Sequence, residues 1–173
     1  KILGELASYL AGLKGKEAEE VTVGLSSNQI GFRIGKTVFI SRLVEGNFPA
    51  FEQIIPKSHE MEIQINAEKL MAVTKRAAIC CNERSGAVKY TFKKDALVVN
   101  SASQSMDFED ELEIDYKGKD FQISFNPKFV LDILKAAGDS EITAEFTSPA
   151  TPALLRVKGR EDLIYIVMPL RTQ

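Results

Sequence analysis

The sequence predicts an α+β fold in which two helices pack side by side on antiparallel sheets and the domain repeats itself about a pseudo-two-fold axis. Two observations lead to this prediction. A segment with the order strand, asparagine, helix occurs twice, at residues 63–68 and 123–128. Each copy is followed by short stretches in which apolar and polar residues alternate, the pattern of half-buried strands. Two copies of one unit predict a single domain built from two similar halves.

The first element is an amphipathic helix over residues 1–12, because apolar residues recur there at helical spacing up to Gly12. Alternating apolar positions then predict three strands. The turn residues Ser26-Ser27-Asn28 and Gly35-Lys36 separate these strands, so an antiparallel meander is expected. The apolar positions concerned are Ile2, Leu3, Leu6, Tyr9, Leu10 and Leu13 in the helix, and Val21, Val23, Leu25, Ile30, Phe32, Ile34, Val38 and Ile40 in the strands.

The same helix and meander return near the C-terminus. Three segments match in order: residues 1–6 match 128–133, residues 21–27 match 142–148, and residues 38–40 match 164–166. Three ordered matches indicate a repeated unit rather than chance similarity.

Asn66 and Asn126 are expected to cap two helices, near residues 67–80 and 127–137. Asparagine is a favoured N-cap because its side-chain oxygen accepts an otherwise unpaired helix N–H group, and Pro127 stands where a missing N–H costs nothing. Further strands are expected around residues 88–92, 96–99 and 112–116. Lys117-Gly118-Lys119 is a hairpin signal that is expected to close one strand pair.

Residues 58–173 contain both copies of the unit and are predicted to form a complete domain. Residues 1–57 contain one copy and are predicted to be the second half of a similar domain plus a linker, in a truncated piece of a longer protein. Repetition with a period of about 60 residues also favours a ring or an array of similar units.

Composition limits the possible classes of protein. The chain has 173 residues, of which 45% are hydrophobic, enough for one good core or one core plus a fragment of another. Its formal net charge of -2 argues against coating of DNA by bulk positive charge. No apolar run is long enough to span a bilayer and no signal peptide is present, so a cytoplasmic location is expected. Cys80 and Cys81 are adjacent, and neighbouring residues hardly ever reach disulfide geometry, so no disulfide is expected.

Catalysis, metal binding and a cofactor are not expected. The chain has one histidine, His59, and a solvated loop residue is its simplest interpretation. No phosphate loop, zinc motif or nucleophile elbow occurs. The acidic stretch at residues 107–115 lies on a predicted strand, where alternate side chains point to opposite faces and carboxylates do not converge on a metal. Charges on an edge strand ordinarily block unwanted pairing. A metal-dependent enzyme that uses this strand is therefore the weakest functional hypothesis.

Three segments resemble bacterial DNA polymerase sliding clamps, the beta subunits of DNA polymerase III. Residues 43–57 resemble the linker between the second and third domains of that family, and residues 165–171 resemble its C-terminal signature. Arg76-Ala77-Ala78-Ile79, with Asn82-Glu83, resembles the first helix of its third domain. The resemblance implies the DNA clamp fold, with residues 1–57 as the second half of the central domain plus the linker and 58–173 as the C-terminal domain.

The resemblance also implies a function. Family members are non-catalytic processivity factors: a ring dimer of three-domain subunits, arranged head to tail, encircles duplex DNA without reading its sequence. A hydrophobic pocket tethers the replicative polymerase, the clamp loader and repair proteins through short peptide motifs. The alternative is a monomeric peptide-binding regulatory module of the same fold. Size measurement of the full-length protein separates the two, because a ring requires stable association.

Two sets of site residues concern DNA and the second subunit. Basic residues on the polar sides of the two capped helices are solvated surface in the simplest interpretation, and in a clamp they face the duplex. The acidic strand would meet a more basic edge of the partner subunit, with apolar contact from the end of the first of these helices. The expected DNA-facing residues are Lys69, Lys75, Arg76, Lys128 and Lys135, and the expected dimer-interface residues are Ile79, Cys80, Asp107, Glu109 and Glu111.

The third set forms the peptide pocket. The C-terminal segment could be a last core strand with a frayed end, and the resemblance makes it one wall of the pocket. An apolar groove rich in Met and Pro accepts the aliphatic and aromatic anchors of short peptides. The expected pocket residues are Pro49, Ile54, Ala150, Pro152, Ile166, Val167, Met168, Pro169, Leu170 and Arg171.

Overall fold

The computed structural model describes residues 2–13, 20–48, 50–81 and 86–171. The chain divides into two compact units, unit 1 over residues 1–49 and unit 2 over residues 50–173. Pro49, which was predicted to line the peptide pocket, and Asn82-Glu83 lie outside the described residues.

The described residues of unit 1 form one helix and one antiparallel sheet, as the periodicity predicted. The sheet has the order β1-β2-β3. Its second turn uses Gly35 at φ 55°, in the left-handed region that glycine enters without steric cost. The elements are α1 (Ile2–Gly12), β1 (Thr22–Leu25), β2 (Gln29–Ile34) and β3 (Thr37–Arg42).

The core of unit 1 is small. Leu6, Phe32 and Ile34 are its buried hydrophobic residues among those that the structure describes. Tyr9 packs edge-on against Phe39, with ring centroids 5.2 Å apart. Large apolar side chains remain exposed on the helix and on the strands, namely Leu3, Val23, Leu25, Val38 and Ile40.

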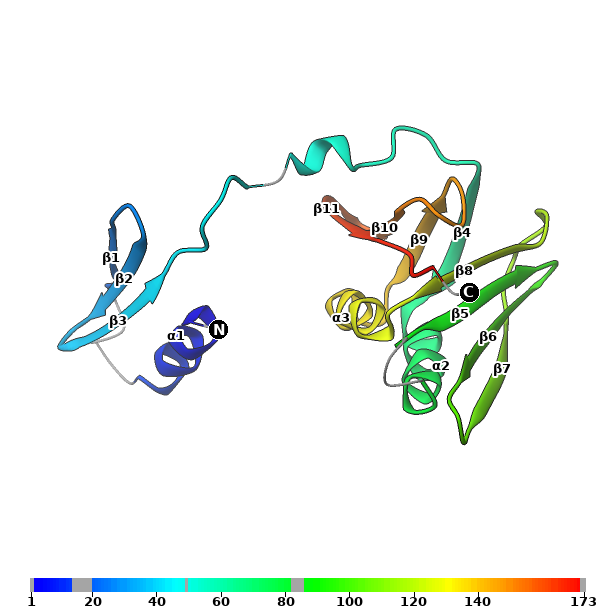
Figure 1. The fold of residues 1–173 in the computed structure, drawn as a ribbon, viewed down its shortest axis with the longest axis horizontal. Helices are drawn as coiled ribbons and strands as arrows, with labels where there is room; N and C mark the ends of the chain where they lie inside the picture. The colour runs from blue at the N-terminus through cyan, green and yellow to red at the C-terminus, as the bar shows by residue number, and fades with distance from the viewer. Residues whose placement is uncertain (1, 14–19, 49, 82–85, 172–173) are drawn as a thin grey trace. The chain divides into compact units, whose positions relative to one another are not determined.

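In the part that the structure describes, unit 2 contains two α-helices and two four-stranded antiparallel sheets, shown in Figure 1. A short 3₁₀ helix, η2, precedes them. The elements are η2 (Phe51–Gln53), β4 (Met61–Asn66), α2 (Ala67–Ile79), β5 (Val88–Lys93), β6 (Ala96–Ala102), β7 (Asp107–Glu113), β8 (Phe121–Phe125), α3 (Pro127–Ala137), β9 (Glu141–Phe146), β10 (Ala153–Val157) and β11 (Arg160–Val167).

The sheet orders confirm the predicted pseudo-two-fold architecture. One sheet runs β7-β6-β5-β8 and the other runs β11-β10-β9-β4. Each sheet therefore takes three strands from one copy of the unit and the strand before the helix from the other copy. Helices α2 and α3 contact each other and lie side by side against the sheets (Figure 1). A continuous buried core joins both helices to both sheets.

Both helices begin at the predicted caps. The side-chain oxygen of Asn66 accepts a hydrogen bond from the Lys69 N–H group at 3.0 Å, and that of Asn126 accepts one from the Lys128 N–H group at 3.0 Å. Pro127 occupies the start of α3, where no N–H group is needed. Both asparagines therefore cap the first turn of their helix, Asn66 through the N–H group three residues on and Asn126 through the one two residues on.

The connection between β7 and β8 corrects two predictions. Strand β7 ends at Glu113, so the strand expected to reach residue 116 is shorter, and Ile114 and Tyr116 beyond it form backbone hydrogen bonds with Asp95. Lys117-Gly118-Lys119 does not close a hairpin, because β8 pairs with β5 at the far edge of the sheet and not with β7. A local turn signal indicates only that the chain changes direction. It does not determine which strand β8 pairs with, and that partner is β5.

Gly118 is needed because Tyr116 lies against it. A Cβ atom on Gly118 would overlap the phenol ring of Tyr116. That ring is buried, and its hydroxyl group donates a hydrogen bond to the carbonyl oxygen of Lys119 at 2.5 Å. The connection from β7 to β8 therefore closes around a fixed tyrosine.

Replacing Gly118 with alanine should lower the free energy of unfolding by about 1–3 kcal/mol, the usual range for overpacking a buried site. Urea denaturation followed by circular dichroism measures the change. Lys117→Ala, in the same loop with an exposed side chain, is the matched control and should change stability by less than about 0.5 kcal/mol. Wild-type stability of Gly118→Ala would show that Tyr116 is free to move aside.

Candidate functional site

A groove of roughly 450 Å³ lies between α3 and β11 in unit 2. Its walls are mostly apolar. Two of the side chains are large and exposed, Phe129 at 57% and Met168 at 61%, so the groove presents hydrophobic surface to water. The lining residues are Phe129, Asp132, Ile133, Tyr165, Ile166, Val167 and Met168.

The wall from α3 exists because Phe129 lies at the margin of the buried stripe of its helix, where its side chain is exposed. The buried residues of α3 include Val130, Ile133 and Leu134, which face the core. Asp132 and Ile133 follow Phe129 by three and four positions, so they lie beside it on the helix surface. This arrangement places a phenylalanine, a carboxylate and an aliphatic residue along one side of the groove.

The wall from β11 is held in place at its end. Val167 pairs with Ala153 on β10, and both residues are buried. Beyond that pair, the Leu170 N–H group donates a hydrogen bond to the carbonyl oxygen of Ser124 on β8 at 2.7 Å. The C-terminal segment therefore crosses from one sheet to the other, which fixes the backbone on both sides of Met168.

The Ser148–Pro152 loop lies at the same end of this sheet. It is closed by a hydrogen bond from the Ser148 N–H group to the Thr151 hydroxyl oxygen at 2.9 Å. Pro152 directly precedes Ala153, and Met168 directly follows the partner of Ala153, so both leave the sheet at the same place. Ala150 is exposed and Pro152 is half-buried.

Three of the predicted pocket residues line the groove, namely Ile166, Val167 and Met168. Others, namely Ile54, Ala150, Pro152, Pro169, Leu170 and Arg171, do not line it. Four lining residues were not predicted: Phe129, Asp132, Ile133 and Tyr165. The signal for Phe129 was present in the sequence, because Phe129 precedes Ile133 by four positions and so lies at the edge of the apolar stripe of the helix.

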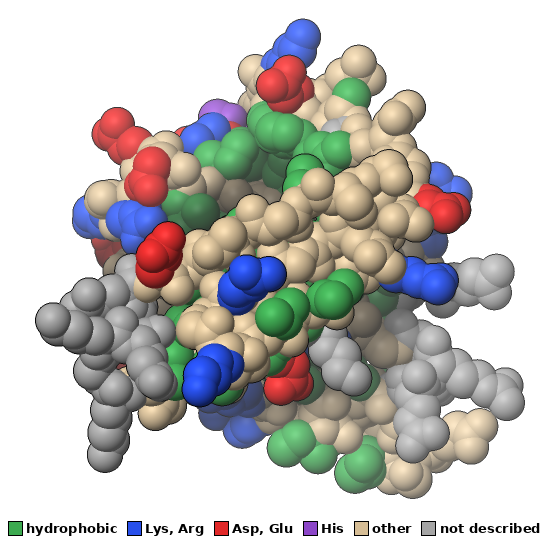
Figure 2. Space-filling view, turned by 90° about the vertical axis from the view of Figure 1, so that its left-hand side faces the viewer, with side chains coloured by type: hydrophobic (Ala, Val, Ile, Leu, Met, Phe, Trp, Pro, Cys, Tyr) green, Lys and Arg blue, Asp and Glu red, His purple; other side chains and the backbone are tan. Residues whose placement is uncertain are grey.

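The basic residues predicted to face DNA are exposed on α2 and α3. Lys135 forms an ion pair with Asp132 at 3.5 Å. Arg76 is ion-paired with Asp110 of β7. In the view of Figure 2, Lys and Arg side chains lie scattered among acidic and apolar ones and do not form one basic surface.

The predicted interface residues gather near β7, which is an edge strand of its sheet. Asp107, Glu109 and Glu111 are exposed on the outward side of this strand. The Asn100 side-chain amide on β6 donates a hydrogen bond to Glu109 at 2.6 Å. At the end of α2, Ile79 is 73% exposed and Cys80 is half-buried.

The two cysteines are free and differ in their surroundings. The Cys81 sulfur lies 3.5 Å from the carbonyl oxygens of Ala77 and Ala87, either of which can accept its single S–H proton. Burial raises the pKa of the Cys81 thiol, which keeps it protonated and unreactive at neutral pH. Cys81 therefore acts as a small packing residue just after the end of α2.

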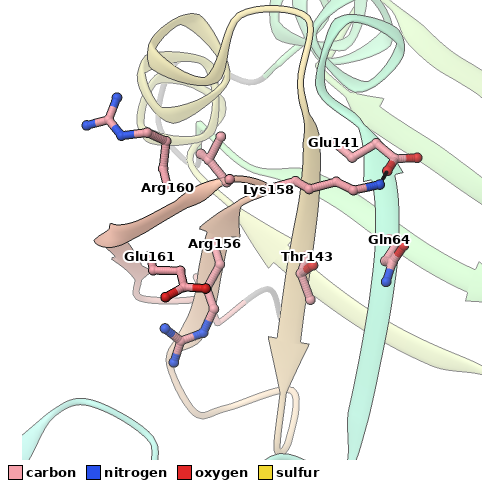
Figure 3. Close-up of a pocket in the computed structure, with 9 residues that line it drawn as sticks. Gln64, Glu141, Thr143, Arg156, Lys158, Arg160 and Glu161 are labelled. Atoms are coloured by element: carbon pink, nitrogen blue, oxygen red, sulfur yellow. Dashed lines mark hydrogen bonds and ion pairs between the residues drawn. The ribbon is translucent and has the colours of Figure 1, made fainter.

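A second hollow, of roughly 490 Å³, lies on the outward face of the β4, β9 and β10 strands (Figure 3). Its basic residues already have carboxylate partners. Lys158 reaches Glu141 at 2.5 Å, Arg156 contacts Glu145 at 2.8 Å, and Arg160, which points away from the Lys158 pair in Figure 3, contacts Asp162 at 3.1 Å. Charges that are paired in this way do not make a binding site for an anion.

Within the described part of the chain, no group of three or more His, Cys, Asp or Glu residues is arranged to hold a metal ion. His59 lies near two carboxylates, with Nδ1 at 3.2 Å from Glu145 and Nε2 at 3.5 Å from Glu62. Helices α1, α2 and α3 each lack the length and apolarity needed to cross a bilayer.

Comparison with known proteins gives one family. A family model described as "DNA polymerase III beta subunit, C-terminal domain" matches residues 52–171. The beta sliding clamp of Staphylococcus aureus is 28% identical over 99% of this chain, and the chain spans 46% of that relative. The chain thus covers about half the length of the curated relatives it matches.

Solved structures give the same result. A DnaN sliding clamp from Bartonella birtlesii bound to griselimycin superposes with a TM-score of 0.82 at 29% identity, covering 99% of this chain and 45% of that one. A Caulobacter crescentus beta sliding clamp with PEG bound to a putative beta-motif tethering region has a TM-score of 0.75 at 25% identity, covering 88% of this chain and 41% of that one.

Proposed function

Because this chain belongs to the family defined by the C-terminal domain of the DNA polymerase III beta subunit, we propose that it is part of a sliding clamp. In this proposal the protein is a non-catalytic processivity factor of the replicative polymerase. It encircles duplex DNA as a ring dimer, acts in the cytoplasm, and holds its partners through the groove between α3 and β11. Topological linkage keeps the polymerase near the DNA, so affinity for the DNA itself can stay low.

The observation that carries the proposal is the family match over residues 52–171, together with the groove found in that same domain. An apolar groove with a few polar groups suits a short peptide that inserts aliphatic and aromatic side chains. We propose that this groove corresponds to the tethering region named in the Caulobacter crescentus relative. The occupants would be short motifs of the replicative polymerase, the clamp loader and repair proteins.

The remaining pocket residues are proposed to extend the groove rather than to form its floor. Pro152 and Ala150 would border it at the end near Met168, since they leave the sheet beside that residue. Pro169, Leu170 and Arg171 continue from the same wall. Ile54 is exposed on the linker and would add an apolar contact from that side.

We propose that the edge of β7 joins a second subunit. Outward carboxylates on an edge strand favour a partner edge that carries basic residues, because like charges repel. Ile79 supplies exposed apolar area beside them. For unit 1, the repeat and the exposed apolar residues support its assignment, with the linker to residue 57, as the second half of the central domain.

Double-stranded DNA would pass over the polar sides of α2 and α3. Lys69, Lys75, Lys128 and Lys135 are exposed there and would attract phosphates without reading bases. The alternative of a monomeric peptide-binding module predicts no stable self-association. Sedimentation of a full-length clamp subunit that carries this chain distinguishes the two, since a ring needs a stable dimer.

Replacing Lys69 and Lys75 with alanine in that subunit should shorten its retention on circular DNA. In a plot of the logarithm of retention against the logarithm of salt concentration, the magnitude of the slope should fall by about 1–2, because each lysine neutralises about one phosphate. Retention measured by gel filtration at several salt concentrations tests this. Lys94→Ala, at the exposed turn between β5 and β6, is the control and should leave the slope unchanged. Strong preference of the unmodified protein for one DNA sequence would contradict the proposal.

A further inference from the structure

The inner side of β7 carries a carboxylate among apolar residues. Asp107, Glu109, Glu111 and Glu113 are exposed on the outward side of this strand, whereas Phe108, Asp110 and Leu112 are half-buried on the inward side. Phe108 and Leu112 pack against the core. Asp110 therefore lies between two core-facing apolar side chains, and its own side chain remains 33% exposed at the surface.

Arg76 of α2 pairs with this carboxylate. Its Nη2 donates to Oδ2 of Asp110, and the Glu111 N–H group donates to Oδ1 at 2.8 Å. The hydrogen bond from Arg76 is the main cause that lowers the pKa of Asp110. The ion pair thus joins the last turn of α2 to the edge strand.

A second hydrogen bond holds the same turn. The Ser101 hydroxyl group on β6 donates to the carbonyl oxygen of Ala77 at 2.7 Å, and Ser101 is buried. Ser101 is the register partner of Phe108 on β7. Ile79 follows Arg76 by three positions, so it lies on the same side of the helix as the arginine.

We propose that Arg76 is a positioning residue for the subunit edge and not a contact to DNA. It holds the end of α2 against β7, so that Ile79 and the outward carboxylates of β7 form one surface for the partner subunit. By neutralising Asp110, it also leaves the negative charge of the strand on the outward side. The inference rests on the proposed function, because that function assigns this edge to a second subunit.

The role of the ion pair between Arg76 and Asp110 can be tested in this chain. In NMR spectra of Arg76→Gln, we expect the signals of the Ile79 methyl groups and of the amides at residues 107–112 to move, and the unfolding equilibrium constant to rise by up to about fivefold. Asp110→Asn should give the same result, and the double variant should be little worse than either single one. Arg76→Lys keeps the positive charge, so its signals and its stability should lie between those of Arg76→Gln and the wild type. Lys75→Gln, which has no carboxylate partner in the described part of the chain, should not move these signals.

The pH dependence of the stability difference separates loss of the ion pair from a general loss of packing, because a general loss of packing would not vary with pH in this way. A carboxylate whose pKa is lowered in the folded state contributes stability above its unfolded value of about 3.9, and this contribution is lost as the pH falls. The stability difference between wild type and Arg76→Gln should therefore be full at pH 7 and shrink near pH 3. A difference that does not depend on pH would overturn the proposed ion-pair role.

The consequence for assembly needs a full-length clamp subunit. There, Arg76→Gln should raise the dimer dissociation constant roughly tenfold, while Lys75→Gln should not. Unmoved Ile79 and β7 signals in this chain, or a full-length Arg76→Gln variant that dimerises as tightly as wild type, would overturn the positioning role. If the unmodified subunit does not dimerise, the proposed ring fails, and the NMR result in this chain still decides whether Arg76 orders the edge.

Discussion

Replacing Phe129 with alanine should weaken the binding of clamp-binding peptides at least tenfold. Phe129 is half-exposed in the free protein and lies in the groove with Met168, so a docked anchor would bury both. Burial of a large apolar side chain contributes about 1.5–3 kcal/mol, and about 1.4 kcal/mol corresponds to tenfold in affinity. Aromatic residues in the centre of a pocket usually contribute most.

Calorimetric titration of a peptide with leucine and phenylalanine anchors into this chain measures the effect. Met106→Ala is a suitable control, because Met106 is also a large exposed apolar residue and lies between β6 and β7. Deletion of residues 168–173 should remove most of the remaining binding, since it takes away the wall that contains Met168. Unchanged affinity of Phe129→Ala would mean that peptides dock elsewhere.

The combined replacement of Ile79 and Cys80 with alanine should convert a full-length clamp subunit from dimer to monomer. Ile79 is 73% exposed at the end of α2, beside the acidic edge of β7, so its apolar area is available to a partner. Loss of both contacts should cost about 3 kcal/mol, or roughly 100-fold in the dissociation constant.

Sedimentation velocity at low micromolar concentration tests this prediction. Met168→Ala is the matched control, because it removes a similar exposed apolar side chain from the groove and should leave the dimer intact. A double variant that remains as dimeric as wild type would show that the interface lies at another edge.

The repeated unit could be predicted because its signals are local. The two asparagine caps and the apolar periodicities of the following helices depend on neighbours in the chain, and the structure confirms both. The pairing of β8 was missed for the opposite reason. Lys117-Gly118-Lys119 indicates a turn, but the partner of β8 is β5, which lies far away in the sequence.

The site was predicted less completely than the fold. The periodicity of α2 placed Arg76 on the exposed side, and this is where it lies. Its partner Asp110 is 34 residues away, on a strand whose position depends on the whole sheet. The α3 wall of the groove was missed because the repeat matches Phe129 to Ile2, an apolar helix position, and an apolar position at the edge of a stripe can be buried or exposed.

The most direct test of the account is the topology of DNA binding by a full-length clamp subunit that carries this chain. The protein is loaded onto circular DNA by a clamp loader, separated from free protein, and the DNA is then cut once with a restriction enzyme. A ring should stay on the intact circle and slide off the linear product, because it holds DNA by linkage and not by base contacts. Equal retention on circular and linear DNA would contradict the proposed ring.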